Sequence, residues 1–401
     1  MSWVASSIAD RALSMRSPKF GVIAEVRSLI QGVEGVVDMG YGEPNFMTPV
    51  HIREAGKRAM DEGHTHYVLP VEGLTPLREA IARKLLNENS IPADPATQVL
   101  VTAGVQEAIN VALLTLINSG DEVIMPDPYY YVDPLGVMLA GGTPVYTHLR
   151  EENDFRLDID DVKSKITPKT KAIIYISPNC PTGSVFPRED LQALAELAAE
   201  RKIFILTDEI YEKLVYDGTP HCSIASLPAA RDITISMFGF SKAYAMTGWR
   251  VGFLTGPAEL VRTMLEVHSQ LVLCTNSIAQ HAALAALEGP QECIEEMRQD
   301  YEARRNVFVD GLNRLGFACK RPLGSFYVYS NITGFNMPAS QLAKILAKEA
   351  KVVGYPGSAF TNGDDGENYL RFAYTKDMDS LKLALERMEK VVSTLPRGDA
   401  A

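Results

Sequence analysis

Short runs of apolar residues alternate with longer segments in which apolar residues recur every three or four positions. Leu77, Ile81 and Leu85 share one face of a helix that Thr75 and Pro76 are expected to cap. A second helix is predicted over residues 104–117, and a third carries Leu191, Leu194, Ala195 and Ala198. The apolar runs that read as buried strands cover residues 99–104, 122–128, 171–179, 204–211, 233–242 and 252–256. Near-continuous apolar strands separated by helices predict an α/β fold with a mostly parallel sheet covered on both faces.

The rhythm changes near residue 290. A long helix precedes a strand at 324–332, another helix, a strand at 368–375 and a closing helix, which together predict a smaller α+β domain. Residues 1–38 are expected to hold a short amphipathic helix, and the Gly- and Pro-rich segment 40–49 is a loop. We therefore expect three regions: residues 1–47, an arm and part of the small domain; residues 48–290, a large domain; and residues 291–401, the small C-terminal domain.

Charge and composition exclude several classes of protein. The chain has 401 residues, 39 Lys plus Arg and 50 Asp plus Glu, and this net charge of −11 disfavours a nucleic-acid partner. It contains no unbroken apolar stretch long enough to span a membrane, and its first residues lack the apolar block of a secretory signal, so a soluble cytoplasmic protein is expected. Five dispersed cysteines without a CxxC pair favour reduced thiols over disulfides or a metal site.

The interval from 204 to 250 carries the most informative chemistry. Asp208 ends one predicted strand, Lys242 ends another, and Tyr211 and Arg250 follow them closely. Taken singly, Asp208 is typical of a turn or helix cap and Lys242 of a solvated surface. Because the carboxyl ends of parallel strands meet at one sheet edge, the four side chains are instead expected to converge. Amine, carboxylate, phenol and guanidinium are the groups that pyridoxal 5′-phosphate requires.

Several motifs in one order resemble the fold type I, pyridoxal-phosphate-dependent aminotransferases of the aspartate aminotransferase-like class I/II. They are GEPNF (42–46), HYVLPVEGLTPLREAIA (66–82), TAGVQEAI (102–109), SPNCPTG (177–183), TDEIYEKLVY (207–216), SKAYAMTGWRVG (241–252), PLGSFYV (322–328) and YLRFAY (369–374). The resemblance covers nearly the whole chain. It implies the same α/β fold, pyridoxal 5′-phosphate as cofactor, and a homodimer with shared active sites.

The resemblance also implies roles for individual residues. Lys242 is the Schiff-base lysine, Asp208 pairs with the pyridine nitrogen, and Tyr211 donates to the ring hydroxyl. The phosphate is assigned to Arg250, Ser241 and the backbone of Ala103 and Gly104. Tyr67 matches a tyrosine that reaches the phosphate from the partner subunit. A strand that ends in a Gly-containing turn at a helix N-terminus does present free N–H groups to an anion. A plain βα turn, and an exposed loop position for Tyr67, remain the alternatives.

Three further residues are assigned by the resemblance to the substrate and the cofactor ring. Arg371 matches the arginine that binds the substrate α-carboxylate, which a bidentate guanidinium suits. Gly42 matches a loop position whose backbone approaches the substrate, and Tyr130 an aromatic residue stacked on the ring. The alternative for Arg371 is the outward face of a half-buried strand, and for a run of tyrosines simple packing.

Two positions depart from the family pattern. The residue directly before PTG is usually an asparagine whose amide reaches the ring hydroxyl, but here it is Cys180, with Asn179 one position earlier. A thiol is a weaker donor than an amide, so either the lysine-bound cofactor titrates at a higher pH or Tyr211 holds the ring oxygen alone. Gly239 stands where some members carry a phosphate-binding serine, which leaves more to Ser241.

The expected reaction is ping-pong transfer of an amino group from an α-amino acid to a 2-keto acid, with the freed Lys242 as general base. A β-lyase, a decarboxylase or an oxidase that uses the same cofactor stays open as an alternative. A noncatalytic ligand-binding protein is disfavoured because Lys242 is retained, and a nicotinamide dehydrogenase because no GxGxxG follows a strand. The tyrosines at 129–131 either favour aromatic substrates or face the core.

Overall fold

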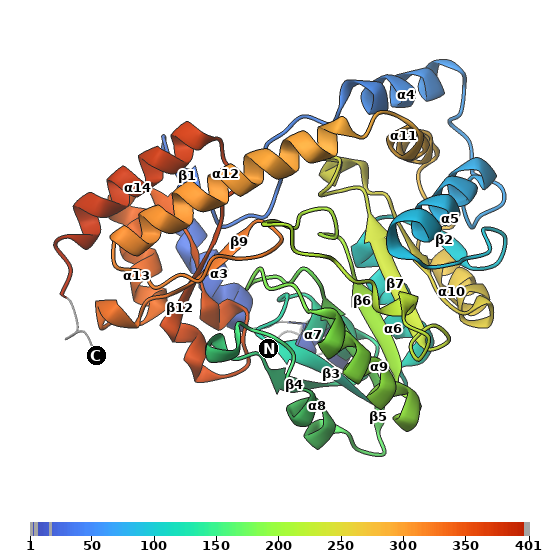
Figure 1. The fold of residues 1–401 in the computed structure, drawn as a ribbon, viewed down its shortest axis with the longest axis horizontal. Coiled ribbons are helices and arrows are strands. Elements are labelled where there is room, and N and C mark those ends of the chain that lie inside the picture. The colour runs from blue at the N-terminus through green and yellow to red at the C-terminus, as the bar shows by residue number, and fades with distance from the viewer. Residues whose placement is uncertain (1–2, 4–6, 16–17, 397–401) are drawn as a thin grey trace.

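The computed structural model describes residues 3, 7–15 and 18–396, and its centre is a twisted sheet. The described residues form a seven-stranded sheet in the order β2-β8-β7-β6-β5-β3-β4 (Figure 1). The strands are β2 (Val99–Thr102), β3 (Glu122–Asp127), β4 (Thr143–His148), β5 (Thr170–Ile176), β6 (Phe204–Asp208), β7 (Thr234–Gly239) and β8 (Gly252–Thr255). β4, β3, β5, β6 and β7 are parallel, whereas β8 runs antiparallel to both of its neighbours. The predicted mostly parallel sheet is confirmed, and β4 is a strand that the pattern did not indicate.

Helices cover both faces of this sheet. They are α4 (Val50–Asp61), α5 (Thr75–Asn89), α6 (Val105–Leu116), α7 (Asp133–Leu139), α8 (Ile159–Lys165), α9 (Arg188–Arg201), α10 (Ala258–Leu271) and α11 (Ser277–Glu288). Alternate strand residues point to opposite faces, so Ile174 packs in the core with α6 while Ile173 packs in the core with α9. α5 begins at Thr75 as predicted, but its N-cap is Leu74 and no side chain caps it.

The C-terminal part forms a smaller unit around an antiparallel sheet. Its strands are ordered β11 (Tyr355–Pro356), β12 (Tyr369–Ala373) and β9 (Tyr327–Asn331), and its helices are α12 (Glu292–Arg314), α13 (Ala339–Ile345) and α14 (Met378–Val392). The N-terminal segment joins this unit, because β1 (Val37–Asp38) pairs in parallel with β10 (Val352–Val353) (Figure 1). Two helices, α2 (Asp10–Ser14) and α3 (Pro18–Ser28), replace the single short helix expected before residue 38, part of which lies outside the described residues.

The antiparallel course of β8 brings the chemistry of three strands to one edge. Gly252, the first residue of β8, is opposite Thr102 on one side and Gly239 on the other. The residues just after β2 and β7 and just before β8 therefore lie together. This places Arg250, which precedes β8, beside the ends of two strands whose direction is opposite to that of β8.

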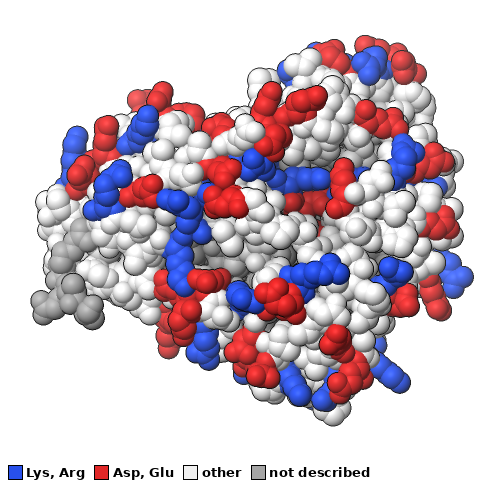
Figure 2. Space-filling view, in the orientation of Figure 1, with Lys and Arg blue, Asp and Glu red and all other residues white. Residues whose placement is uncertain are grey.

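The visible face of the molecule carries both signs of charge. Lys and Arg are interspersed with Asp and Glu, without a basic patch on that face (Figure 2). No helix among the described residues is long and apolar enough to cross a membrane.

Candidate active site

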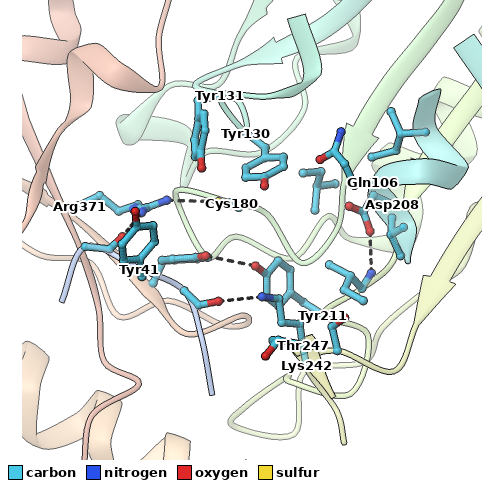
Figure 3. Close-up of a pocket in the computed structure, with 18 of the residues that line it drawn as sticks. Tyr41, Gln106, Tyr130, Tyr131, Cys180, Asp208, Tyr211, Lys242, Thr247 and Arg371 are labelled. Atoms are coloured by element: carbon cyan, nitrogen blue, oxygen red, sulfur yellow. Dashed lines mark hydrogen bonds between the residues drawn. The ribbon is translucent and has the colours of Figure 1, made fainter. Parts of the chain in front are cut away.

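A cavity of about 240 Å³ opens at this sheet edge, between the large sheet and the C-terminal unit. Segment 40–42 closes one side of it. Figure 3 shows Arg371 and Asp208 on opposite sides, with Tyr130, Tyr211 and Lys242 between them. The predicted site residues that line the cavity are Gly42, Tyr130, Cys180, Asp208, Tyr211, Ser241, Lys242, Arg250 and Arg371. The convergence expected from strand ends is therefore present in space.

Lys242 points into the cavity from the segment that follows β7. Its Nζ donates to the carbonyl oxygen of Gly42 at 2.7 Å (Figure 3). Burial lowers the pKa of the Lys242 ammonium to about 8, since a charged group is poorly solvated there. A lysine with this pKa yields the neutral amine far more readily than a surface lysine does, and a neutral amine is what nucleophilic attack and proton removal require.

Asp208 ends β6 and is buried at the end of the cavity opposite Arg371. Burial raises the pKa of its carboxyl group to about 7, and the backbone N–H of Ile210 donates to its Oδ1 at 2.9 Å. That is the one hydrogen bond to this carboxylate among the described residues. A buried carboxylate that faces a cavity with unused acceptor capacity suits a protonated ring nitrogen, as the cofactor's pyridine would supply.

The turn after β2 does not offer the phosphate the Ala103 and Gly104 N–H groups that the resemblance implied. The N–H of Ala103 donates to Glu107 Oε2 at 2.6 Å, and the N–H of Gly104 donates to the carbonyl of Thr102 at 2.8 Å, so neither N–H is free for an anion. The groups left over are the N–H groups of Val105 and Gln106, which have no acceptor in a preceding helical turn and whose residues line the cavity. The sequence did contain the signal, because both residues directly follow the Gly-containing turn.

Arg250 holds this turn from the other side. Its Nη2 donates to the carbonyl of Ala103 at 3.3 Å and its Nη1 to the carbonyl of Thr247 at 3.1 Å. Gly104 has φ +85°, and a Cβ there would lie 2.7 Å from Arg250 Nη2. Glycine is thus required for both the backbone conformation and the close approach. A guanidinium beside N–H groups at a helix N-terminus that have no intrahelical acceptor is suited to a phosphate.

Arg371 lies at the far side of the cavity, and it is buried rather than on an outward face. Its Nη2 donates to the carbonyl of Gly40 and its Nη1 to the sulfur of Cys180 at 3.7 Å, while its Nε has no partner among the described residues. The rings of Phe360 and Tyr327 lie 4.1 and 4.4 Å from its guanidinium carbon. A buried guanidinium with donor capacity to spare suits a carboxylate.

Tyr327 is a site residue that the sequence reasoning missed, although it lies in the quoted stretch PLGSFYV. Its hydroxyl is 3.3 Å from that of Tyr211, and it lines the cavity. Burial raises the pKa of Tyr211 well above that of a free phenol, so this residue stays a hydrogen-bond donor. Gly42 lies against Tyr327: a Cβ at this position would be only 1.7 Å from the hydroxyl oxygen.

The two departures from the family pattern have different structural outcomes. Cys180 lines the cavity, and burial raises the pKa of its thiol to about 11. Asn179 is not among the lining residues; its Oδ1 accepts from the N–H and the hydroxyl of Thr182 inside the turn. At Gly239, a Cβ would lie 2.8 Å from Ile210 Cδ1 and 3.0 Å from Val105 Cγ2, so the space for a serine is already filled.

The tyrosine run divides between cavity and core. Tyr130 and Tyr131 line the cavity, whereas Tyr129 stacks on Tyr146 at 5.2 Å between ring centroids. Tyr67 does not line the cavity of its own chain and is 75% exposed. Among the described residues, no group of three or more His, Cys, Asp or Glu side chains could hold a metal ion.

Comparison with known proteins identifies the class of enzyme. Residues 34–388 match the family "Aminotransferase class I and II". The chain is 42% identical to aromatic-amino-acid aminotransferase 2 of Thermococcus litoralis, over 96% of this chain and 98% of that protein. It is 41% identical to an aspartate aminotransferase of Pyrococcus abyssi, over 92% and 95%. The solved aspartate aminotransferase of Thermus thermophilus with maleate superposes with a TM-score of 0.89 at 37% identity, covering 96% of this chain and 99% of that one.

The chain therefore belongs to the class I and II aminotransferases. Its fold is the fold type I architecture, and its cofactor is pyridoxal 5′-phosphate. It catalyses transamination between amino acids and keto acids, which the relatives' names favour over elimination or decarboxylation.

Proposed function

We propose that this aminotransferase uses aromatic or other uncharged α-amino acids as donors in preference to aspartate. The observation that carries the proposal is the set of charges in the cavity. Among the described residues that line it, the cationic side chains are Lys242, Arg250 and Arg371. Each is assigned to another group: Lys242 to the cofactor aldehyde, Arg250 to the phosphate and Arg371 to the substrate α-carboxylate. A second substrate carboxylate would find no further cation among these lining residues, because the others are neutral apart from the acidic Asp208.

The remaining lining residues support the same preference. The rings of Tyr41, Tyr130, Tyr131, Tyr327 and Tyr355 surround the space between the two ends of the cavity. Aromatic rings pair favourably with one another at centroid separations of 4.5–7 Å, so they would stabilise an aromatic donor and contribute little to a dicarboxylate. Relatives are named for both aromatic and aspartate substrates, so family membership leaves this choice to the cavity.

The proposed residue roles follow from position and proton affinity. When bound, pyridoxal 5′-phosphate withdraws electrons from the carbon that bears the substrate amino group. Asp208 keeps the pyridine nitrogen protonated, Arg371 fixes the α-carboxylate, and Arg250 with the Val105 and Gln106 N–H groups holds the phosphate. Neutral Lys242 takes the proton from Cα, and its low pKa supports this role. Tyr211 would donate to the ring oxygen, and Tyr130 would supply an aromatic surface for the ring.

We further propose a cytoplasmic homodimer in which Tyr67 reaches the phosphate in the partner's site. The exposed position of Tyr67, outside the cavity of its own chain, is what this arrangement requires. The regions proposed within each chain are residues 1–47, 48–290 and 291–401. Mixing Tyr67→Phe with Lys242→Ala subunits tests the sharing: because each hybrid dimer has one site free of both changes, activity should rise above that of either variant alone. If the mixture shows only the average of the two separate activities, the sites are not shared.

The donor preference is tested by spectroscopy and steady-state kinetics together. The visible band of the cofactor-loaded protein should be lost when phenylalanine or tyrosine is added without a keto acid, and should return when a keto acid follows. We expect kcat/KM for phenylalanine to exceed that for aspartate by at least about tenfold, the ratio that corresponds to about 1.4 kcal/mol. A higher kcat/KM for aspartate would refute the proposed preference but would leave the transaminase activity standing.

A further inference from the structure

A carboxylate contacts the turn after β2 (residues 103–104) and is itself hydrogen-bonded to a buried histidine. Glu107 is in the first turn of α6, and its Oε2 accepts the N–H of Ala103 at 2.6 Å. Its Oε1 is 2.7 Å from Nδ1 of His268, which comes from α10. Because a carboxylate only accepts hydrogen bonds, the Nδ1 of His268 donates. The two residues therefore connect α10, α6 and the turn in one chain of hydrogen bonds.

The contact with Glu107 is the one hydrogen bond that His268 makes through its ring among the described residues. Its side chain is fully buried, and its Nε2 has no hydrogen-bond partner among the described residues. Leaving a buried ring nitrogen unsatisfied costs stability, and an apolar side chain would fill the same place without that cost. The hydrogen bond from Nδ1 to Glu107 is the feature that a histidine provides at this position and an apolar residue does not.

The contact fixes the turn from the side opposite Arg250. Glu107 accepts from the N–H of Ala103, Arg250 donates to the carbonyl of the same residue, and Gly104, which follows, adopts φ +85°. With both polar groups of Ala103 occupied, the N–H groups left without an acceptor in a preceding helical turn are those of Val105 and Gln106, whose residues line the cavity. A carboxylate beside an anion site is electrostatically unfavourable, so its presence here points to a geometric role.

We propose that Glu107 and His268 are positioning residues of the phosphate site: His268 orients Glu107, and Glu107 presets the turn so that the Val105 and Gln106 N–H groups meet the phosphate. This inference rests on the proposed placement of the cofactor phosphate at the turn. It requires the hydrogen bonds of Glu107 and not its charge. Glu107→Gln keeps an acceptor for the N–H of Ala103, and its amide can donate to Nδ1 of His268 once the imidazole carries its proton on Nε2, whereas Glu107→Ala removes both contacts.

The experiment compares the dissociation constants of two ligands, pyridoxal 5′-phosphate and pyridoxal, which differ only in the phosphate. Both are measured by equilibrium dialysis against the cofactor-free full-length protein. Glu107→Ala and His268→Leu should weaken pyridoxal 5′-phosphate at least about tenfold and pyridoxal less than about threefold, because a misdirected hydrogen bond to a charged group costs that much. Glu107→Gln should bind both ligands as the native protein does, or the phosphorylated one more tightly.

A second matched pair guards against a folding defect. His268→Asn retains an N–H donor near the position of Nδ1, while His268→Leu fills a similar volume without one, and the Tm of each cofactor-free variant monitors folding. Recovery of phosphate-dependent affinity in His268→Asn supports positioning. Equal weakening of both ligands, or native affinity in Glu107→Ala, would overturn the proposal. A native protein that binds pyridoxal as tightly as pyridoxal 5′-phosphate would refute the phosphate placement itself, independently of the donor preference.

Discussion

Gly42→Ala is the perturbation whose consequence is most sharply defined by the packing around the site. An added Cβ would lie 1.7 Å from the Tyr327 hydroxyl oxygen, 2.5 Å from its Cζ and 2.8 Å from Phe326 Cε2. The hydroxyl must move by about 1.7 Å to reach an ordinary 3.4 Å contact. Tyr327 is buried in contact with Tyr211 and the guanidinium of Arg371, so its displaced ring would disturb these contacts or enter the cavity that it lines.

The magnitude follows from two separate costs. Overpacking a buried site destabilises by about 1–3 kcal/mol. Displacement of catalytic groups by 1 Å or more costs up to about 100-fold in rate, and Gly42 also supplies the carbonyl that accepts from Lys242 at 2.7 Å. We therefore expect kcat/KM to fall about 10- to 100-fold, while the Tm falls by a few degrees.

The assay is steady-state transamination beside thermal unfolding of the loaded enzyme. Gly21→Ala is the matched control, because a Cβ at this exposed helical glycine meets nothing within 4 Å. It should keep native activity. Since Tyr327 is the obstacle, Gly42→Ala and Tyr327→Phe should be non-additive, with the double variant losing less than the sum of the single losses. Native kcat/KM and Tm in Gly42→Ala would refute the reasoning.

Three other predictions concern the ionisable groups of the cavity. Lys242→Ala should lower kcat by about 10²- to 10⁴-fold, the range of general acid–base catalysis, and a rate measurement with native kcat would exclude Lys242 as the base. Burial raises the pKa of Asp208 from 3.8 to about 7, so the folded cofactor-free protein retains a proton that the unfolded chain has lost between these values. The contribution of Asp208 to the free energy of unfolding should fall as pH rises from 4 to 7, by up to about 4 kcal/mol. The difference in unfolding free energy between the native protein and Asp208→Asn, measured in urea, should therefore decrease over this range, and a constant difference would contradict the prediction. Cys180→Asn should lower the midpoint of the absorbance titration of the bound cofactor by about 1 pH unit, since an amide donates more strongly than a thiol; an unchanged midpoint would mean that Tyr211 holds the ring oxygen alone.

Local pattern was sufficient for most of the large sheet. Strands β5, β6 and β7 are buried on both faces, so their apolar runs stand out, and Asp208 and Lys242 could be placed at one edge from strand ends alone. β4 could not be found in this way, because its residues are mostly half-buried or exposed and carry a proline. The antiparallel direction of β8 likewise depends on long-range pairing that the apolar pattern does not encode.

The parts of the site that the sequence did not reveal depend on contacts between distant segments. Tyr327 acts through its contacts with Gly42 and Tyr211, and no spacing along the chain links these residues. At the turn, Ala103 could be placed beside the anion site, but its N–H is held by Glu107 four positions later, and that of Gly104 by Thr102. The contact of Glu107 with a histidine 161 positions further along the chain is the part that no local pattern indicates.

We propose that Lys242 carries the cofactor in this cavity. Borohydride reduction of the pyridoxal-5′-phosphate-loaded protein, followed by proteolysis and mass spectrometry, tests it most directly by making the lysine attachment permanent. We expect the cofactor's mass increment on the peptide that contains Lys242, and its loss from that peptide when phenylalanine is added before reduction. An increment on any other lysine, or none on a protein that has retained the cofactor, would contradict it.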